Sequence, residues 1–247
     1  MRNLLSALGI GVALFALFFV TRLLNGPEAV APGVLAAIAA YYVLARRTFK
    51  QAEQVFMDAA KALQSMPPKI DLAVSTLERA YVFAPAQFGV RSQVDTQIGM
   101  IYFLQQDFNK AMPFLKRSLA FGHWLGGAML AVIYYKKKDH AEMKKTFDVV
   151  LKRAKAQGLA WNLYAYLLTQ VGENDAAQKI LVEGLKKTKN DARVNESLLA
   201  VQNGKKIKMR SYKEQWYQFH LERPPADQQQ MQMGGRMSKL DRRGRWS

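Results

Sequence analysis

The sequence predicts an all-α protein, in which an N-terminal transmembrane helical hairpin precedes an α-solenoid of three to four helix pairs. Two observations lead to this prediction. Two uncharged apolar runs lie within the first 45 residues, and a pattern of small and large apolar residues recurs at 32 and then 34 residues further along. We expect C-terminal capping helices and a basic tail after the pairs. The expected divisions are an anchor over 1–47, a repeat domain with its capping helix over 48–204, a basic and aromatic helical segment over 205–225, and a flexible tail over 226–247.

The first apolar run, residues 3–21, contains no charged residue. At a rise of ~1.5 Å per residue, a helix of this length spans roughly the ~30 Å hydrocarbon core of a bilayer. A secretory signal peptide is the competing interpretation. It is disfavoured because the run is long and ends in FFVTRLL, without a cleavage site of the small-x-small type. The run therefore predicts an uncleaved membrane span.

The second apolar run, residues 29–45, follows the short loop LNGPE and is also uncharged. Tyr41 and Tyr42 lie near its end, where aromatic residues favour the membrane–water interface. Small residues in the two runs suggest close packing of the two helices, although they could equally be filling apolar segments. These residues are Gly9, Gly11, Gly33, Ala37 and Ala40.

Basic residues around the two runs predict their orientation. Arg46, Arg47 and Lys50 follow the second run and Arg2 precedes the first, whereas the connecting loop has only Arg22 at its edge. Lys and Arg are enriched on the cytoplasmic side of membrane proteins. We therefore expect a membrane protein with two spans and both termini in the cytoplasm, in contact with lipid through residues 3–21 and 29–45.

A repeated pattern follows the apolar runs. Its first copy is Ile98, Gly99, Tyr102, Ala111, Leu115 and Ser118. The copy 32 residues later is Leu130, Ala131, Tyr134, Met143, Phe147 and Val150, and the next, after a further 34, is Tyr164, Ala165, Leu168, Ala177, Leu181 and Gly184. A degraded copy 38 residues before the first is Ala60, Lys61 and Gln64, then Ala73, Leu77, Ala80 and Pro85. Small residues admit a neighbouring helix and large ones fill its grooves, as stacked helical hairpins require.

With Trp161 three residues before Tyr164, this pattern resembles the tetratricopeptide repeat (TPR), over about residues 52–190. Met143 stands where the family has a small residue, and Gly184 is unfavourable inside a helix. The resemblance implies helix pairs stacked with a concave face. It also implies a membrane-anchored bacterial-type TPR protein. Proteins of this kind act as adaptors or assembly factors that hold other proteins at the inner membrane. An unrelated array of helical hairpins is the alternative.

The resemblance places the partner-binding residues on the first helix of each pair. The predicted groove set is Met100, Phe103, Leu104, Val132, Tyr135, Lys136, Asn162, Tyr166 and Gln170. Rings supply contact area and amides satisfy backbone groups, so this set suits an extended or helical peptide. The alternative is that Phe103 and Tyr135 pack inside the domain.

Two C-terminal segments complete the prediction. Residues 191–204 read as a capping helix, with Asp191 as its N-cap and Gly204 as its stop. Residues 211–225 read as a second helix, because Ser211 and Glu214 have the spacing of a capping box. Its Tyr212, Trp216 and Phe219 would share one face, which we expect to pack onto the solenoid. Docking to a partner or to the bilayer interface is the alternative.

Composition and motifs argue against catalysis. The chain has no cysteine and three histidines, and no phosphate-binding loop or H-E-x-x-H motif is present. We therefore expect no enzyme activity, no cofactor and no metal. The predicted function is that of an adaptor for protein partners, and two alternatives are open. One is a structural subunit held through the hairpin, and the other is an RNA- or ribosome-binding factor, which the formal net charge of +17 would suit.

Overall fold

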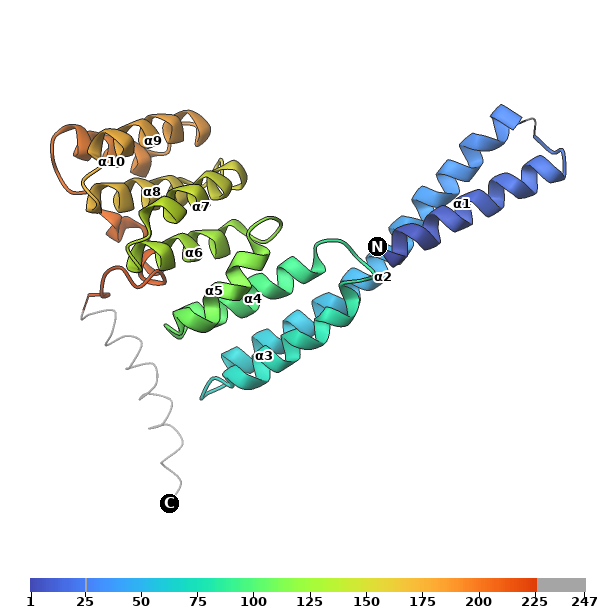
Figure 1. Ribbon diagram of the computed structural model, residues 1–247, viewed down its shortest axis with the longest axis horizontal. Helices are drawn as coiled ribbons and strands as arrows, with labels where there is room; N and C mark the ends of the chain where they lie inside the picture. The colour runs from blue at the N-terminus through green and yellow to red at the C-terminus, as the bar shows by residue number, and fades with distance from the viewer. Residues whose placement is uncertain (25, 226–247) are drawn as a thin grey trace, which may run out of the picture. The chain divides into compact units, whose positions relative to one another are not determined.

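The computed structural model describes residues 1–24 and 26–225, and all regular secondary structure in this part of the chain is helical (Figure 1). The predicted all-α class is therefore confirmed for these residues. The chain divides into two compact units, Met1–Arg153 and a second that begins at Ala154. Each unit is described by itself. The predicted tail, residues 226–247, lies outside the described residues.

The N-terminal hairpin consists of α1 (Arg2–Val20) and the first half of α2 (Gly26–Gln64), which pack along each other (Figure 1). Both helices are long and apolar enough to cross a membrane. Glycine is required where they meet, since a Cβ on Gly11 would lie 2.7 Å from the carbonyl oxygen of Gly33 and 2.8 Å from Ala37 Cβ. A Cβ on Gly9 would meet nothing within 4 Å, so this glycine takes no part in the contact.

Helix α2 continues without a break through the expected end of the anchor at residue 47. It has 39 residues, which at ~1.5 Å each is a rod of about 58 Å. Its second half packs against α3 (Ile70–Arg79). The sequence after Arg47 contains no Gly or Pro before Pro67, so nothing interrupts the helix. One helix therefore belongs to both the hairpin and the first helix pair.

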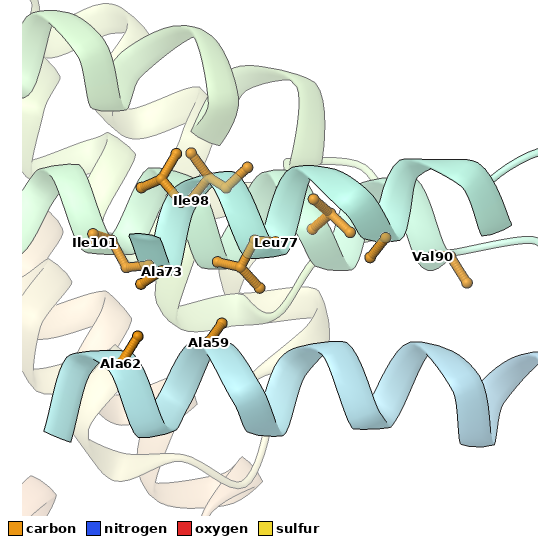
Figure 2. Close-up of a cluster of buried hydrophobic side chains, with 10 residues drawn as sticks. Ala59, Ala62, Ala73, Leu77, Val90, Ile98 and Ile101 are labelled. Atoms are coloured by element: carbon orange, nitrogen blue, oxygen red, sulfur yellow. The ribbon is translucent and has the colours of Figure 1, made fainter. Parts of the chain in front are cut away.

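The first helix pair has a different register from the one predicted. Ala60, Lys61 and Gln64 are exposed, while Ala59 and Ala62 are buried in a core that α2 shares with α3 and α4 (Figure 2). The buried face needs apolar residues three and four apart, and Ala59, Ala62 and Leu63 have this spacing, whereas Lys61 lies on the exposed side. The second half of the pair is as predicted, with Ala73, Leu77 and Ala80 buried.

Two further helix pairs complete the first unit. They are α4 (Val90–Leu104) with α5 (Phe108–Ser118), and α6 (Trp124–Lys136) with α7 (His140–Arg153); η1 (Ala80–Phe83) precedes α4. A Cβ on Gly99 would lie 2.6 Å from Leu115 Cδ2, which is the contact between small and large residues that the spacing predicts. The residues of the two repeat copies are buried except for Tyr102, which is half-buried.

The second unit contains α8 (Gly158–Gln170), α9 (Asn174–Lys187) and α10 (Ala192–Gln202), each in contact with the other two. Helix α10 has the predicted ends. The Asp191 side chain accepts a hydrogen bond from the backbone N–H of Arg193 at 2.9 Å, and Gly204 follows the helix with a φ of +64°. Its apolar stripe is partly covered, because Val194 and Leu198 are buried but Leu199 is half exposed.

Gly184 has a structural role in this unit. A Cβ at this position would lie 2.9 to 3.0 Å from Trp161, whose buried indole N–H donates to the Lys155 carbonyl at 3.0 Å. We expect Gly184→Ala to destabilise the protein, because overpacking costs about 1–3 kcal/mol against a gain in helix propensity of about 1 kcal/mol. Denaturant unfolding of the full chain in detergent measures the change. Asn195→Ala, on the exposed side of α10, is the matched control, and equal effects of the two changes would contradict this account.

Candidate functional site

The C-terminal segment packs onto α8 through its aromatic residues, as expected. Tyr212 is 4% exposed, and Trp216 and Phe219 are fully buried. The predicted helix over this segment is wrong. The chain instead forms a short 3-10 helix, η2 (Met209–Tyr212), and a four-residue helix, α11 (Glu214–Tyr217). Lys213 lies between them with a φ of +49°, so no continuous helix forms and Ser211 is not an N-cap. The positions of the rings are therefore set by their packing on α8, and the rings do not share a helical face.

Asn162, a predicted groove residue on α8, binds this segment. Its Nδ2 donates to the Tyr212 hydroxyl at 2.8 Å and to the Arg193 carbonyl at 3.2 Å. The Arg193 guanidinium lies 4.3 Å from the centre of the Tyr212 ring. Asn162 is 1% exposed, so its Nδ2 makes both bonds away from water, while its Oδ1 is buried with no hydrogen-bond partner among the described residues.

Tyr166, one turn further along α8, contacts the next aromatic residue. Its ring meets the Trp216 ring edge to face, with centroids 4.9 Å apart. The Trp216 indole N–H donates to a Glu222 carboxylate oxygen at 3.2 Å, and the Tyr166 hydroxyl donates to the other at 3.4 Å. Gln170, the third predicted groove residue on this helix, is exposed. A short aromatic segment of the chain therefore packs on two of the predicted partner-binding residues, Asn162 and Tyr166.

The Tyr212 hydroxyl makes this contact dependent on pH. Burial, followed by the negative charge of Asp191, raises the pKa of Tyr212 to about 12. The ordinary pKa of a tyrosine, which applies to the unfolded chain, is 10.0. The neutral Tyr212 hydroxyl therefore stabilises the fold fully below pH 10, and this stabilisation is lost as the pH rises toward 12. We expect Tyr212→Phe to be less stable than the parent chain at pH 8 by about 1 kcal/mol, one hydrogen bond, and this difference to shrink or reverse above pH 10. Melting temperatures of both chains across this range measure it, and a constant difference would contradict the assignment.

The groove residues of the first unit are partly inside the domain. Phe103 and Val132 are fully buried, and the Phe103 ring lies 5.3 Å from that of Phe108. The Lys136 ammonium lies 5.3 Å from the centre of the Phe108 ring, and partial burial lowers the pKa of Lys136. Leu104 is 44% exposed, and Met100 and Tyr135 are half-buried. The accessible part of the predicted groove set on α4 and α6 is therefore smaller than predicted.

A buried ionic cluster near the start of α4 was not predicted. Asp95 is 1% exposed and accepts hydrogen bonds from the Tyr81 hydroxyl at 2.7 Å and from Arg117 Nη2 at 2.7 Å. Burial, followed by the interaction with Asp95, raises the pKa of Tyr81 to about 12. The sequence does carry a signal, because Asp95 lies three residues before Ile98 and so on the buried side of its helix. The cluster joins η1, α4 and α5.

No metal centre is assembled in residues 1–24 and 26–225, where no three His, Cys, Asp or Glu side chains come together. The absence of cofactor, metal and catalysis stays a prediction. Comparison with protein-family models, curated proteins and solved structures finds no match to this chain. The resemblance to TPR proteins therefore depends on the repeated residues alone.

Proposed function

We propose that this protein is a non-catalytic, membrane-anchored adaptor with TPR-like helix pairs, which holds protein partners at the cytoplasmic face of the inner membrane. The observation that carries the proposal is the packing of the C-terminal segment onto α8. Asn162 and Tyr166, selected in the sequence as partner-binding residues, bind a short aromatic segment through an amide–hydroxyl hydrogen bond and an edge-to-face ring contact. On the first helices of other pairs, a peptide from a partner would make ring and apolar contacts with the accessible groove residues Leu104 and Tyr135.

Continuity of α2 supports the role of an anchor. A single helix runs from an apolar stretch long enough to cross a membrane into the core of the first unit. A domain held in this way stays close to the bilayer, so the local concentration of other membrane-bound proteins around it is high. A modest affinity for each partner is then sufficient. The proposed orientation places both termini in the cytoplasm, because the basic residues flank the hairpin at that end.

Photo-crosslinking in intact membranes tests the proposal. A benzophenone amino acid at Leu104 or Tyr135, on the accessible part of the predicted groove, is expected to capture a discrete set of proteins by mass spectrometry. Val182 is the matched control position, because it is 39% exposed but lies on α9, the second helix of its pair. Identical captured sets at all three positions would contradict groove binding.

A structural subunit held through its hairpin is the second candidate, and one observation favours it. The hairpin has an apolar groove of about 300 Å³ beside the contact of Gly11 with Gly33, lined also by Leu8, Val12, Phe15, Val30, Val34 and Ala37. Replacing residues 1–47 by an unrelated two-span anchor separates the two candidates. The adaptor keeps its crosslinked partners, whereas the structural subunit loses them. Binding that falls steeply with salt would instead indicate a nucleic-acid partner.

A further inference from the structure

A loop of the first unit is joined to the start of α1. The backbone N–H of Arg2 donates to the Pro85 carbonyl at 2.9 Å, and that of Asn3 donates to the Ala86 carbonyl at 3.2 Å. Side chains extend this link, since Asn3 Nδ2 donates to Thr48 Oγ1 at 2.8 Å. These bonds place residues 84–89, the loop between η1 and α4, level with the first turn of α1.

The level of that turn relative to a bilayer follows from helix length. Helix α1 has 19 residues, or about 28 Å at ~1.5 Å each, close to the ~30 Å thickness of the hydrocarbon core. If α1 spans the membrane, Arg2 lies at one edge of the core. Arg46 and Arg47, at the end of the apolar part of α2, mark the same edge. The loop 84–89 then lies among the lipid headgroups.

Two exposed phenyl rings lie at this loop. Phe88 is 53% exposed and Phe121, from the loop between α5 and α6, is 63% exposed. Their rings meet edge to face with centroids 4.9 Å apart. Phe88 is two residues from Ala86, which is at most about 7 Å of extended chain. Both rings are therefore near the level at which α1 enters the bilayer, where an apolar side chain is stabilised by lipid.

A basic pocket adjoins the same loop. It has a volume of about 430 Å³ and is lined by Ala84, Pro85, Tyr81, Phe114, Arg91 and Arg117. The guanidinium of Arg117 is held in place by buried Asp95, and Arg91 is exposed. Arg117 donates both its Nε and its Nη2 to Asp95, at 3.2 and 2.7 Å, so the exposed Arg91 supplies the fork of N–H donors that the oxygens of a phosphodiester would accept from.

We propose that residues 84–91 and Phe121 form a second contact with the membrane, in which Phe88 and Phe121 insert at headgroup level and Arg91 binds the phosphate of an anionic phospholipid. The proposal rests on the insertion of the hairpin that the proposed function includes. Two attachments, one through the hairpin and one through this surface, would hold the first unit against the bilayer in one orientation. The hairpin would not achieve this by itself, because transmembrane helices tilt in the bilayer and the first unit would tilt with them.

Single-cysteine labelling tests this proposal, since the chain has no cysteine of its own. Phe88→Cys and Phe121→Cys in the full chain each receive a nitroxide label, in vesicles of equal parts phosphatidylglycerol and phosphatidylcholine. Met57→Cys is the aqueous control, because Met57 is 53% exposed and about 16 Å beyond Arg46 along α2. Val12→Cys, in the middle of α1, is the hydrocarbon control.

We expect the labels at positions 88 and 121 to be several-fold less accessible to a water-soluble nickel chelate than the label at 57, and more accessible to oxygen. Equal nickel accessibility at 57, 88 and 121, with the label at 12 in hydrocarbon, overturns this inference alone. Low nickel accessibility without a gain in oxygen indicates a protein contact and also overturns it. A water-accessible label at 12 instead overturns the membrane anchor of the proposed function.

The lipid headgroup is tested with the label at Phe121→Cys. In vesicles of phosphatidylcholine alone, the label is expected to become more accessible to nickel than in the mixed vesicles. Arg91→Gln should abolish this dependence on phosphatidylglycerol, while Lys152→Gln, an exposed change of equal charge on α7, should preserve it. Equal behaviour of the two variants would overturn the assignment of Arg91.

Discussion

Replacement of Trp216 by alanine is expected to lower the free energy of unfolding by about 3–5 kcal/mol, the usual cost of removing a large buried aromatic side chain. Trp216 is fully buried, its ring meets Tyr166, and its indole N–H donates to Glu222. The substitution leaves a cavity and removes the donor to Glu222 at the same time. Denaturant unfolding of the full chain in detergent, followed by far-UV circular dichroism, measures the loss.

Gln215→Ala is the matched control, because Gln215 is the exposed neighbour of Trp216 in α11, and its replacement should change stability by less than about 0.5 kcal/mol. Truncation after Gly204 tests the whole segment, and a clear fall in melting temperature is expected. An unchanged melting temperature in the truncated chain, together with the loss of a crosslinked partner, would show that residues 205–225 serve a partner instead of the fold.

Arg117→Met is expected to destabilise the first unit by about 1–3 kcal/mol, the usual cost of leaving a buried acceptor without one of its partners, because Asp95 is buried although the Arg117 side chain is 45% exposed. The Asp95 side chain is 2% exposed and loses its bond to the Arg117 guanidinium in this variant, although the Tyr81 hydroxyl still donates to it. Methionine keeps an unbranched apolar side chain at this position, but the guanidinium that lies 4.6 Å from the centre of the Phe114 ring is lost together with the charge. The cost therefore reports the lost guanidinium and not a cavity. Thermal unfolding of the full chain measures it.

Lys145→Met provides the comparison for this prediction. Lys145 pairs with Glu142 at 2.7 Å, the same separation as between Arg117 and Asp95, but both side chains are exposed. Exposed pairs contribute about 0–1 kcal/mol, so this variant should lose little stability. Similar losses in the two variants would contradict the assignment of buried Asp95 as the carboxylate that holds η1, α4 and α5 together.

The helix pairs could be predicted from the sequence because their signal is local. Positions three and four residues apart on one helix must be apolar, and a small residue must face a large one on the partner helix. Ile98, Gly99 and Leu115 satisfy both conditions and are buried together. The same reasoning located the ends of α10, since Asp191 and Gly204 act within one turn of the helix.

The candidate site could be predicted only in part. Asn162 and Tyr166 were identified as binding residues, yet their ligand in this structure is the chain's own segment some 50 residues later, as the bond from Asn162 to Tyr212 shows. Phe103 and Val132 were assigned to the surface and are fully buried. A periodic pattern shows which side of a helix is apolar, but several neighbours compete to cover that side, and the pattern does not say which one does.

The sequence by itself determined that the described part of this protein is helical, that two apolar helices lie at its start, and which small and large residues pair in α4 with α5 and in α6 with α7. These properties follow from hydropathy and from the 3.6-residue period, which depend on residues near one another in the chain. The tertiary structure alone decided three others. They are the contact of residues 84–87 with the start of α1, the burial of Asp95 with Tyr81 and Arg117, and the seat of Trp216 on Tyr166. Each joins residues from different elements, and packing energy rather than local propensity selects such contacts.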